Sequence, residues 1–92
     1  MSRVHLSIRG RVQGVYFRQS AKQQAESLGV RGWVRNRSDG TVETVAQGEV
    51  DAVELFVSWC HSGPDHAVVS AVERRDSEPV VLPEGFDVRP SL

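Results

Sequence analysis

The residues best suited to chemistry lie in one short segment near the start of the chain. The segment from Ile8 to Arg18 reads Ile-Arg-Gly-Arg-Val-Gln-Gly-Val-Tyr-Phe-Arg. Gly10 and Gly14 let the backbone turn sharply and bring its N–H groups close to a ligand. A helix that begins after the turn adds unpaired N–H donors and a partial positive charge. The pattern therefore predicts a loop that binds an anion.

Arg18 closes this segment and adds a fixed cation. Its guanidinium is a planar fork that matches two oxygens of a phosphate. Taken alone, Arg18 would be read as an exposed arginine in the first turn of a helix. Beside the glycine-containing turn, it predicts a site for a phosphoryl group.

Several periodic segments are expected to position this loop. Apolar residues alternate with polar ones from Val4 to Ile8, as in a half-buried strand, and apolar residues at helical spacing follow from Phe17. An Asp-Gly step at Asp39 indicates a hairpin turn. The patterns predict a helix from Phe17 to Leu28, strands from Val30 to Arg35 and from Thr41 to Gln47, a helix from near Glu49 that Gly63-Pro64 ends, a strand from Ala67 to Val72, a loop from Asp76 to Gly85 and a short closing strand from Phe86 to Arg89.

This order of elements predicts the fold class. A hairpin and two helical crossovers give a split β-α-β arrangement, βαββαβ with a possible short fifth strand. We expect an α+β, two-layer ferredoxin-like sandwich in which both helices cover one face of an antiparallel sheet. The length of 92 residues predicts a single domain over residues 1–92.

Composition limits the classes of protein that remain. Apolar residues make up 39% of the chain, and no apolar run approaches the roughly 20 residues of a membrane span. Arg3, His5 and Arg9 interrupt any signal-peptide core. A single cysteine, Cys60, excludes an internal disulfide and a cysteine metal site. We expect a cytoplasmic protein with no membrane partner.

The net charge of −1 hides an uneven distribution along the chain. Residues 1–40 hold eight of the 11 basic residues and two of the 12 acidic ones, so the two halves have opposite net charge. Either one region of the fold attracts anions, or the halves interleave and their charges mix. Binding of nucleic acid would need a more basic domain with a basic stripe, so no nucleic-acid partner is expected.

Two segments resemble the signatures of the acylphosphatase family. The first is the segment from Ile8 to Arg18, with Gly10, Val12, Gln13, Gly14, Val15, Phe17 and Arg18 in place. The second is Gly32-Trp33-Val34-Arg35-Asn36, followed at the family's spacing by Gly40, Val42 and Gly48. Two separate signatures in one short chain make the resemblance specific.

The resemblance implies hydrolysis of small-molecule acyl phosphates to a carboxylate and inorganic phosphate, with no metal and no cofactor. It also implies roles for particular residues. Arg18 would bind the substrate phosphate, and Asn36 would position the attacking water. The phosphate would lie in a cradle of backbone N–H groups from Gln13, Gly14, Val15, Tyr16, Phe17 and Arg18. A monomer is expected.

This chemistry agrees with the residue types. The leaving group is a carboxylate, which needs no proton at neutral pH, so a general acid is dispensable. Asn36 is no base, but its amide can orient a water. Strand parity places Asn36 on the side of Val30 and Val34, which we expect to face the helices. Asn36 could instead be an ordinary hairpin residue.

Three other hypotheses remain to be weighed. A non-catalytic ferredoxin-like module that binds RNA or regulates a partner would need aromatic side chains on its central strands, and none is evident there. A domain from a larger maturation enzyme is a second alternative. The chain ends soon after the closing strand and no zinc-finger cysteines follow, which favours a complete small protein. A metal site from Cys60, His61 and His66 lacks the usual ligand spacing.

Overall fold

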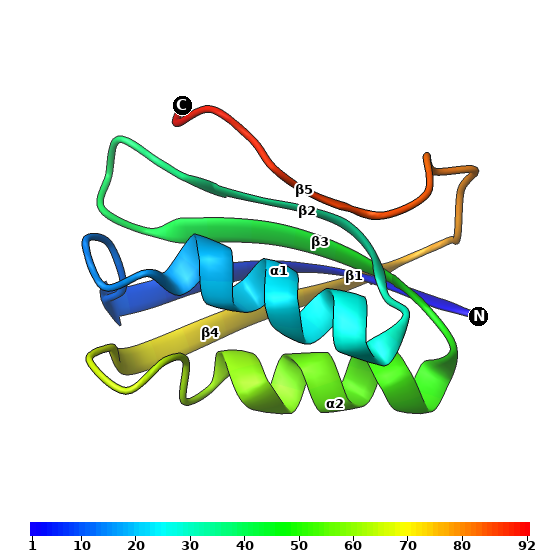
Figure 1. The fold of residues 1–92 in the computed structure, drawn as a ribbon, viewed down its shortest axis with the longest axis horizontal. Helices are drawn as coiled ribbons and strands as arrows, with labels where there is room; N and C mark the ends of the chain where they lie inside the picture. The colour runs from blue at the N-terminus through cyan, green and yellow to red at the C-terminus, as the bar shows by residue number, and fades with distance from the viewer.

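A five-stranded sheet with both helices on one face forms the fold (Figure 1). The computed structural model describes all residues from 1 to 92. The strands lie side by side in the order β4-β1-β3-β2-β5, which confirms the predicted α+β sandwich. The elements in chain order are β1 (Ser2–Arg11), α1 (Phe17–Leu28), β2 (Arg31–Asn36), β3 (Val42–Gly48), α2 (Val50–Cys60), β4 (Val68–Ser77) and β5 (Phe86–Val88).

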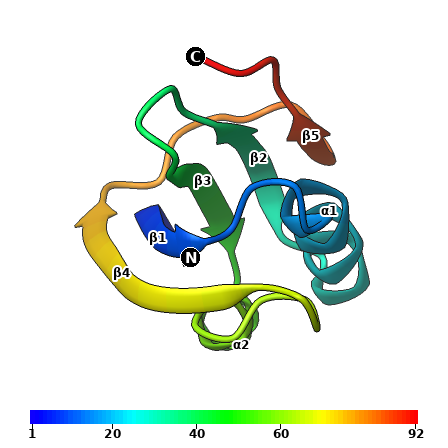
Figure 2. The same cartoon turned by 90° about the vertical axis from the view of Figure 1, so that its left-hand side faces the viewer.

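The fifth strand makes the sheet mixed rather than purely antiparallel. Neighbours among β1 to β4 run antiparallel, whereas β5 pairs with β2 in parallel. This corrects the expected antiparallel sheet, because residues 78–85 carry the chain across to the other edge of the sheet (Figure 2). The Gln47 amide fixes this connection, since Nε2 donates to the Val80 carbonyl at 2.6 Å and Oε1 accepts from the Val80 N–H at 3.0 Å.

The apolar core lies between the sheet and the helices. Val4, Leu6 and Ile8 of β1 are fully buried, as their alternation with polar residues predicts. In α1, Phe17 and Ala21 turn toward the same core at helical spacing. Burial of these side chains supplies the main driving force that holds α1 at a fixed angle to the sheet.

The opposite face of the sheet has no helix over it and holds a network of ion pairs. Glu43 is only 7% exposed, and its carboxylate accepts hydrogen bonds from His5 at 2.7 Å and Arg35 at 2.6 Å. Arg9 pairs with Glu73 at 3.3 Å across neighbouring strands. Basic residues of the first half therefore meet acidic residues of the second half, so the charges of the two halves mix on this face.

Two connections lie together at one end of the sheet, where the candidate site is. The β1–α1 loop and the β2–β3 hairpin lie at the same end of the molecule (Figure 1). Side-chain hydrogen bonds from Gln13 in the loop to Arg37 and Thr41 in the hairpin hold them together. Neither helix has the length and apolar composition that crossing a membrane requires.

Candidate active site

The β1–α1 loop consists of residues 12–16 and alternates between buried and exposed positions. Val12 is 1% exposed and Val15 is 6% exposed, so two side chains anchor the loop in the core. Between and after them, Gly14 and Tyr16 adopt left-handed backbone conformations with φ of 74° and 62°. Turns of this kind direct successive N–H groups toward one side, where they form a concave site for an anion.

The N–H groups of this loop have no acceptors within the protein. None of the backbone N–H groups from Gln13 through Arg18 donates to a backbone carbonyl, and the first helical bond runs from the Ser20 N–H to the Tyr16 carbonyl at 3.0 Å. No side chain caps the start of α1, and no acidic residue lies in its first turn. A helix start normally attracts one or the other. The free donors therefore favour an anion from outside the chain.

Gly10 allows β1 to turn into this loop beside β4. Its φ of 126° lies outside the range that other residues adopt readily, and the β1–β4 register shifts between Arg9 and Gly10. A Cβ atom at this position would collide with the Val68 carbonyl and lie 2.8 Å from the Ser70 nitrogen. Glycine is thus required here for close strand approach as well as for backbone conformation.

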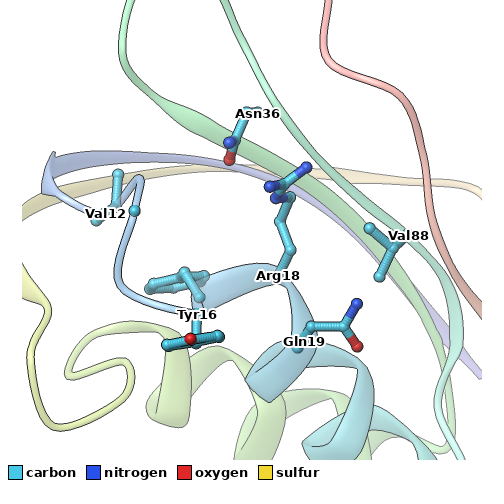
Figure 3. A pocket seen from close by; sticks show the side chains of 8 residues that line it. Val12, Tyr16, Arg18, Gln19, Asn36 and Val88 are labelled. Carbon is cyan, nitrogen blue, oxygen red and sulfur yellow. The ribbon is translucent and has the colours of Figure 1, made fainter.

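Arg18 and Asn36 line the same pocket, although 18 positions separate them in the sequence (Figure 3). The pocket has a volume of about 460 Å³ and lies between the loop, the first turn of α1, the end of β2 and β5. Arg18 extends from α1 toward Asn36 (Figure 3). Five of the ten arginines pair with a carboxylate, as Arg35 does with Glu43, and Arg18 is among the five that do not.

Asn36 places an unused hydrogen-bond acceptor at this pocket. Its side-chain Oδ1 is buried and has no hydrogen-bond partner in the protein. Its main-chain carbonyl, in contrast, accepts from the Leu92 N–H at 3.0 Å. Val34, two residues earlier on β2, is fully buried under the helices, so the parity expected for Asn36 agrees with the structure. A buried unpaired oxygen is costly and is usually explained by water or a ligand.

Comparison with known proteins shows the family to which the chain belongs. The acylphosphatase family model matches residues 4–88. An acylphosphatase from Roseiflexus sp. (strain RS-1) is 53% identical over 88 residues, which cover 96% of this chain and 95% of that protein. The chain belongs to the acylphosphatase family. It is an enzyme that hydrolyses acyl phosphates, and its substrates are small molecules.

Solved structures show the same fold over nearly the whole length of this chain. The crystal structure of acylphosphatase from Bacillus subtilis superposes with a TM-score of 0.92 at 31% identity, over 97% of this chain and 99% of that one. Full-length HypF, in its phosphate- and nucleotide-bound form, matches with a TM-score of 0.88 at 26% identity. That match covers 98% of this chain but 12% of HypF, so the fold also occurs as a small part of a larger protein.

The predicted site residues do not all contribute side chains to the pocket. Gly14, Tyr16, Phe17, Arg18 and Asn36 line it. The Gln13 side chain instead reaches the β2–β3 hairpin, and Val15 is buried in the core. For Gln13 and Val15, only the backbone N–H groups remain as candidate contacts to a ligand.

Three residues that line the pocket were not among the predicted site residues: Val12, Gln19 and Val88. Val12 and Gln19 directly flank the predicted N–H cradle from Gln13 to Arg18 and could have been inferred from their position. Val88 reaches the pocket because β5 pairs with Val34 of β2, and no local signal in the sequence encodes that pairing.

Cys60 takes no part in this site. Its side chain is fully buried in the core, as its place on the apolar stripe of α2 predicts. Burial raises the pKa of the Cys60 thiol well above its ordinary value. A thiol that stays protonated and has no access to substrate is not a nucleophile.

Proposed function

We propose that Arg18 and the loop N–H groups from Gln13 to Arg18 bind the substrate phosphoryl group, and that Asn36 positions the attacking water. The run of free backbone donors beside an unpaired guanidinium supports this assignment most directly. Asn36 lines the same pocket from a different element, so both partners of the reaction have a place in it. The proposal explains why no acidic side chain lies at the start of α1.

The loop N–H groups and Arg18 stabilise the negative charge that develops in the transition state. Phosphoryl transfer spreads negative charge over the three equatorial oxygens, and catalysis depends on positioning and electrostatic stabilisation. Backbone N–H groups in a loop anchored by Val12 and Val15 are held in place before substrate arrives. Arg18 adds a charged bidentate donor, which forms stronger bonds than a neutral group.

Asn36 orients water rather than removing its proton. A carboxamide is not a base at neutral pH, but it has an acceptor oxygen and an amide donor. The unpartnered Oδ1 accepts a hydrogen bond from the water, and the amide N–H contacts a phosphate oxygen. Holding water and phosphorus together in the reactive geometry converts a bimolecular step into an effectively unimolecular one.

The bond changes need no further catalytic group. The water oxygen forms a bond to phosphorus, and the bond from phosphorus to the acyl oxygen breaks with its electron pair on that oxygen. The carboxylate leaves unprotonated, and the proton of the attacking water passes to the phosphate product or to solvent. A stable leaving group removes the need for a general acid or a metal to assist its departure.

Three further statements complete this proposal. The 92 residues act as one acylphosphatase-like domain, because a single core joins the sheet to both helices. The enzyme works as a monomer, since Arg18 and Asn36 of the same chain both line the pocket and the proposed reaction needs no residue from a second copy. It is cytoplasmic, in accord with its single free cysteine.

Phosphate release from benzoyl phosphate, measured with and without a chelator, tests the proposal. We expect rapid release that the chelator leaves unchanged and that inorganic phosphate inhibits competitively. The Arg18→Ala variant should lose most of the release, whereas Lys22→Ala, one turn further along α1, should retain it. Loss of turnover with chelator, or equal activity of the two variants, would contradict the proposed mechanism. RNA binding without hydrolysis would replace it with the binding-module alternative.

A further inference from the structure

A second pocket lies on the open face of the sheet, which is the face that no helix covers. It shares no residue with the active-site pocket. The register of β1 and β4 places His5 opposite Arg75 and Ser7 opposite Glu73. These four residues and Arg37 of the β2–β3 hairpin line the pocket, and none of the five is apolar. A wall made only of polar side chains favours a charged or polar ligand over an apolar one.

The two arginines of this pocket have most of their hydrogen-bond donors free. Arg75 forms no ion pair with a carboxylate of the chain. Arg37 has Glu43 as its one ion-pair partner, at 3.9 Å from Nε. The Glu43 carboxylate already accepts hydrogen bonds from His5 at 2.7 Å and from Arg35 at 2.6 Å. Because a guanidinium has five N–H donors, both arginines of the pocket can bind a ligand without breaking a short ion pair.

Positive charge exceeds negative charge around this pocket. Arg9 pairs with Glu73 at 3.3 Å, and Arg35 pairs with Glu43. Among the groups that line the pocket or belong to its ion pairs, four guanidiniums therefore face two carboxylates. The nearby Asp39 does not line the pocket, and its carboxylate accepts hydrogen bonds within the hairpin instead. The charge that remains is positive, and an anion with two negative charges would balance it.

We propose that this pocket is a binding site for inorganic phosphate, held between the guanidiniums of Arg37 and Arg75. Each guanidinium is a planar fork that matches two oxygens of a tetrahedral oxyanion. The two forks come from the hairpin and from β4, so they approach the anion from different elements. The Ser7 hydroxyl lies in the same wall and can donate a further hydrogen bond. The site is independent of the proposed function, because it uses none of the residues around Arg18.

The size of the pocket supports a small anion. Its volume is about 140 Å³, well below the roughly 300–1,000 Å³ of sites that enclose drug-sized ligands. A phosphate ion has five heavy atoms and fits such a space, whereas a nucleotide does not. The same ion is the product of acyl phosphate hydrolysis, so the enzyme releases this ligand in every turnover.

Arg37 lies between this pocket and the active site. Its side chain lines the pocket on the open face, whereas the preceding residue, Asn36, lines the active-site pocket. The main-chain carbonyl of Arg37 accepts the hydrogen bond from Gln13 at 2.8 Å. An anion that binds the Arg37 side chain therefore restrains the hairpin next to Asn36.

An NMR titration of the backbone amides with inorganic phosphate tests the proposal on the full chain. In wild type we expect two groups of chemical-shift changes, one in the loop at residues 13–18 and one at Ser7, Arg37 and Arg75. Arg18→Ala should remove the first group and keep the second. Changes confined to the loop would overturn the proposal. Changes at Ser7 and Arg75 that sodium chloride reproduces at equal ionic strength would overturn it too, because they would reflect screening rather than a site.

Substitution on the open face then assigns the binding to this pocket. Arg75→Ala should weaken phosphate binding there by at least about tenfold and leave hydrolysis of benzoyl phosphate unchanged. Arg31→Ala is the matched control, because it removes an arginine that lies on the same face but outside the pocket. It should leave phosphate binding unchanged. Equal weakening by the two variants would show diffuse attraction by the whole face and overturn the proposal.

Two further outcomes separate the ligand and the site from the alternatives. Phenyl phosphate should bind at the open face more weakly than inorganic phosphate, because its ring has no place in the pocket. Equal binding of the two would overturn the assignment to the free ion. Absence of hydrolysis and of loop changes, with the changes at Ser7 and Arg75 intact, would refute the proposed function and support this second site.

Discussion

The Gln13 side-chain amide donates a hydrogen bond to the main-chain carbonyl of Arg37 at 2.8 Å and so joins the β1–α1 loop to the β2–β3 hairpin. The same nitrogen donates to the Thr41 carbonyl at 2.9 Å. The hairpin is itself closed by the Arg37 N–H, which donates to Thr41 at 2.9 Å. Because Asn36 directly precedes Arg37, Gln13 sets the position of Asn36 relative to the loop donors.

Replacing this amide with a carboxylate of the same shape tests that link. In Gln13→Glu, both donors are lost and an anion faces two carbonyl oxygens. We expect the free energy of unfolding to fall by about 1–3 kcal/mol and kcat to fall by more than KM rises. Urea unfolding and steady-state kinetics measure the two effects. Gln23→Glu, on the exposed side of α1, is the matched control. Lower stability with unchanged kcat would limit Gln13 to a structural role.

Arg18 should dominate the energetics of catalysis. Removal of one donor to a developing oxyanion costs roughly 2.7–4 kcal/mol, and Arg18→Ala also removes a charge. We expect kcat/KM to fall by at least about a hundredfold to a thousandfold. Arg18→Lys should recover only part of the loss, because an ammonium lacks the planar fork. Activity of Arg18→Ala near that of wild type would remove Arg18 from the mechanism.

The order of elements was predictable because the hydrophobic periodicity and the turn residues indicate the same helices and strands along most of the chain. α1 begins at Phe17 and ends at Leu28 as predicted, since the apolar spacing and the left-handed Gly29 cap mark both limits. β4 was predicted too short, because residues 73–76 are charged and the strand continues through them to Ser77 only by pairing with β1 out to Arg3. Pairing with a distant strand has no local signal in the sequence.

The end of helix α2 and the strand pairing at the sheet edge also could not be predicted from local sequence. α2 ends at Cys60, before the predicted stop at Gly63-Pro64, because hydrogen bonds from His61 and Ser62 close its last turn earlier. The parallel pairing of β5 with β2 could not be inferred either, since the connection before it has no regular period. These errors concern the end of one helix and the pairing of one strand, whereas the two layers of the fold are as predicted.

The site was predicted where it depends on one loop and missed where it depends on packing. Arg18 and Gly14 lie in a local motif, and strand parity correctly placed Asn36 on the helix side. The hydrogen bonds of Gln13 to the hairpin and the position of Val88 arise only when the sheet assembles. Their roles in binding and catalysis stay predictions until the variants are measured.

Asn36→Ala should separate catalysis from binding. If Asn36 orients water, kcat should fall by about tenfold to a hundredfold. The inhibition constant for inorganic phosphate should change much less, because Arg18 and the loop donors remain. Asn36→Asp keeps the shape but adds a negative charge, so it should weaken phosphate binding as well. Equal losses of turnover and phosphate affinity in Asn36→Ala would argue against a role in positioning water.

Glu43 makes stability depend on pH through the open face of the sheet. Burial alone would raise the pKa of this carboxyl, but hydrogen bonds from His5 and Arg35 outweigh burial and hold the pKa below its ordinary value of 4.5. Between the lowered pKa and the ordinary one, the unfolded chain binds more protons than the folded enzyme. The stabilisation from Glu43 is therefore present above its unfolded pKa and disappears as pH falls through its folded pKa.

The Glu43→Gln variant tests whether the stabilisation from Glu43 disappears as the pH falls. At neutral pH we expect the variant to be less stable than wild type by about 1–3 kcal/mol, because Arg35 and His5 lose a charged acceptor. As the pH falls from the ordinary carboxyl pKa through the lowered pKa of the folded enzyme, wild-type Glu43 becomes protonated, so the difference in unfolding free energy should shrink steadily. Urea unfolding at a series of pH values measures it. Glu26→Gln, on the exposed side of α1, should show no such trend. A difference between Glu43→Gln and wild type that stayed constant from neutral pH into acid would mean that Glu43 stabilises the sheet by packing rather than by charge.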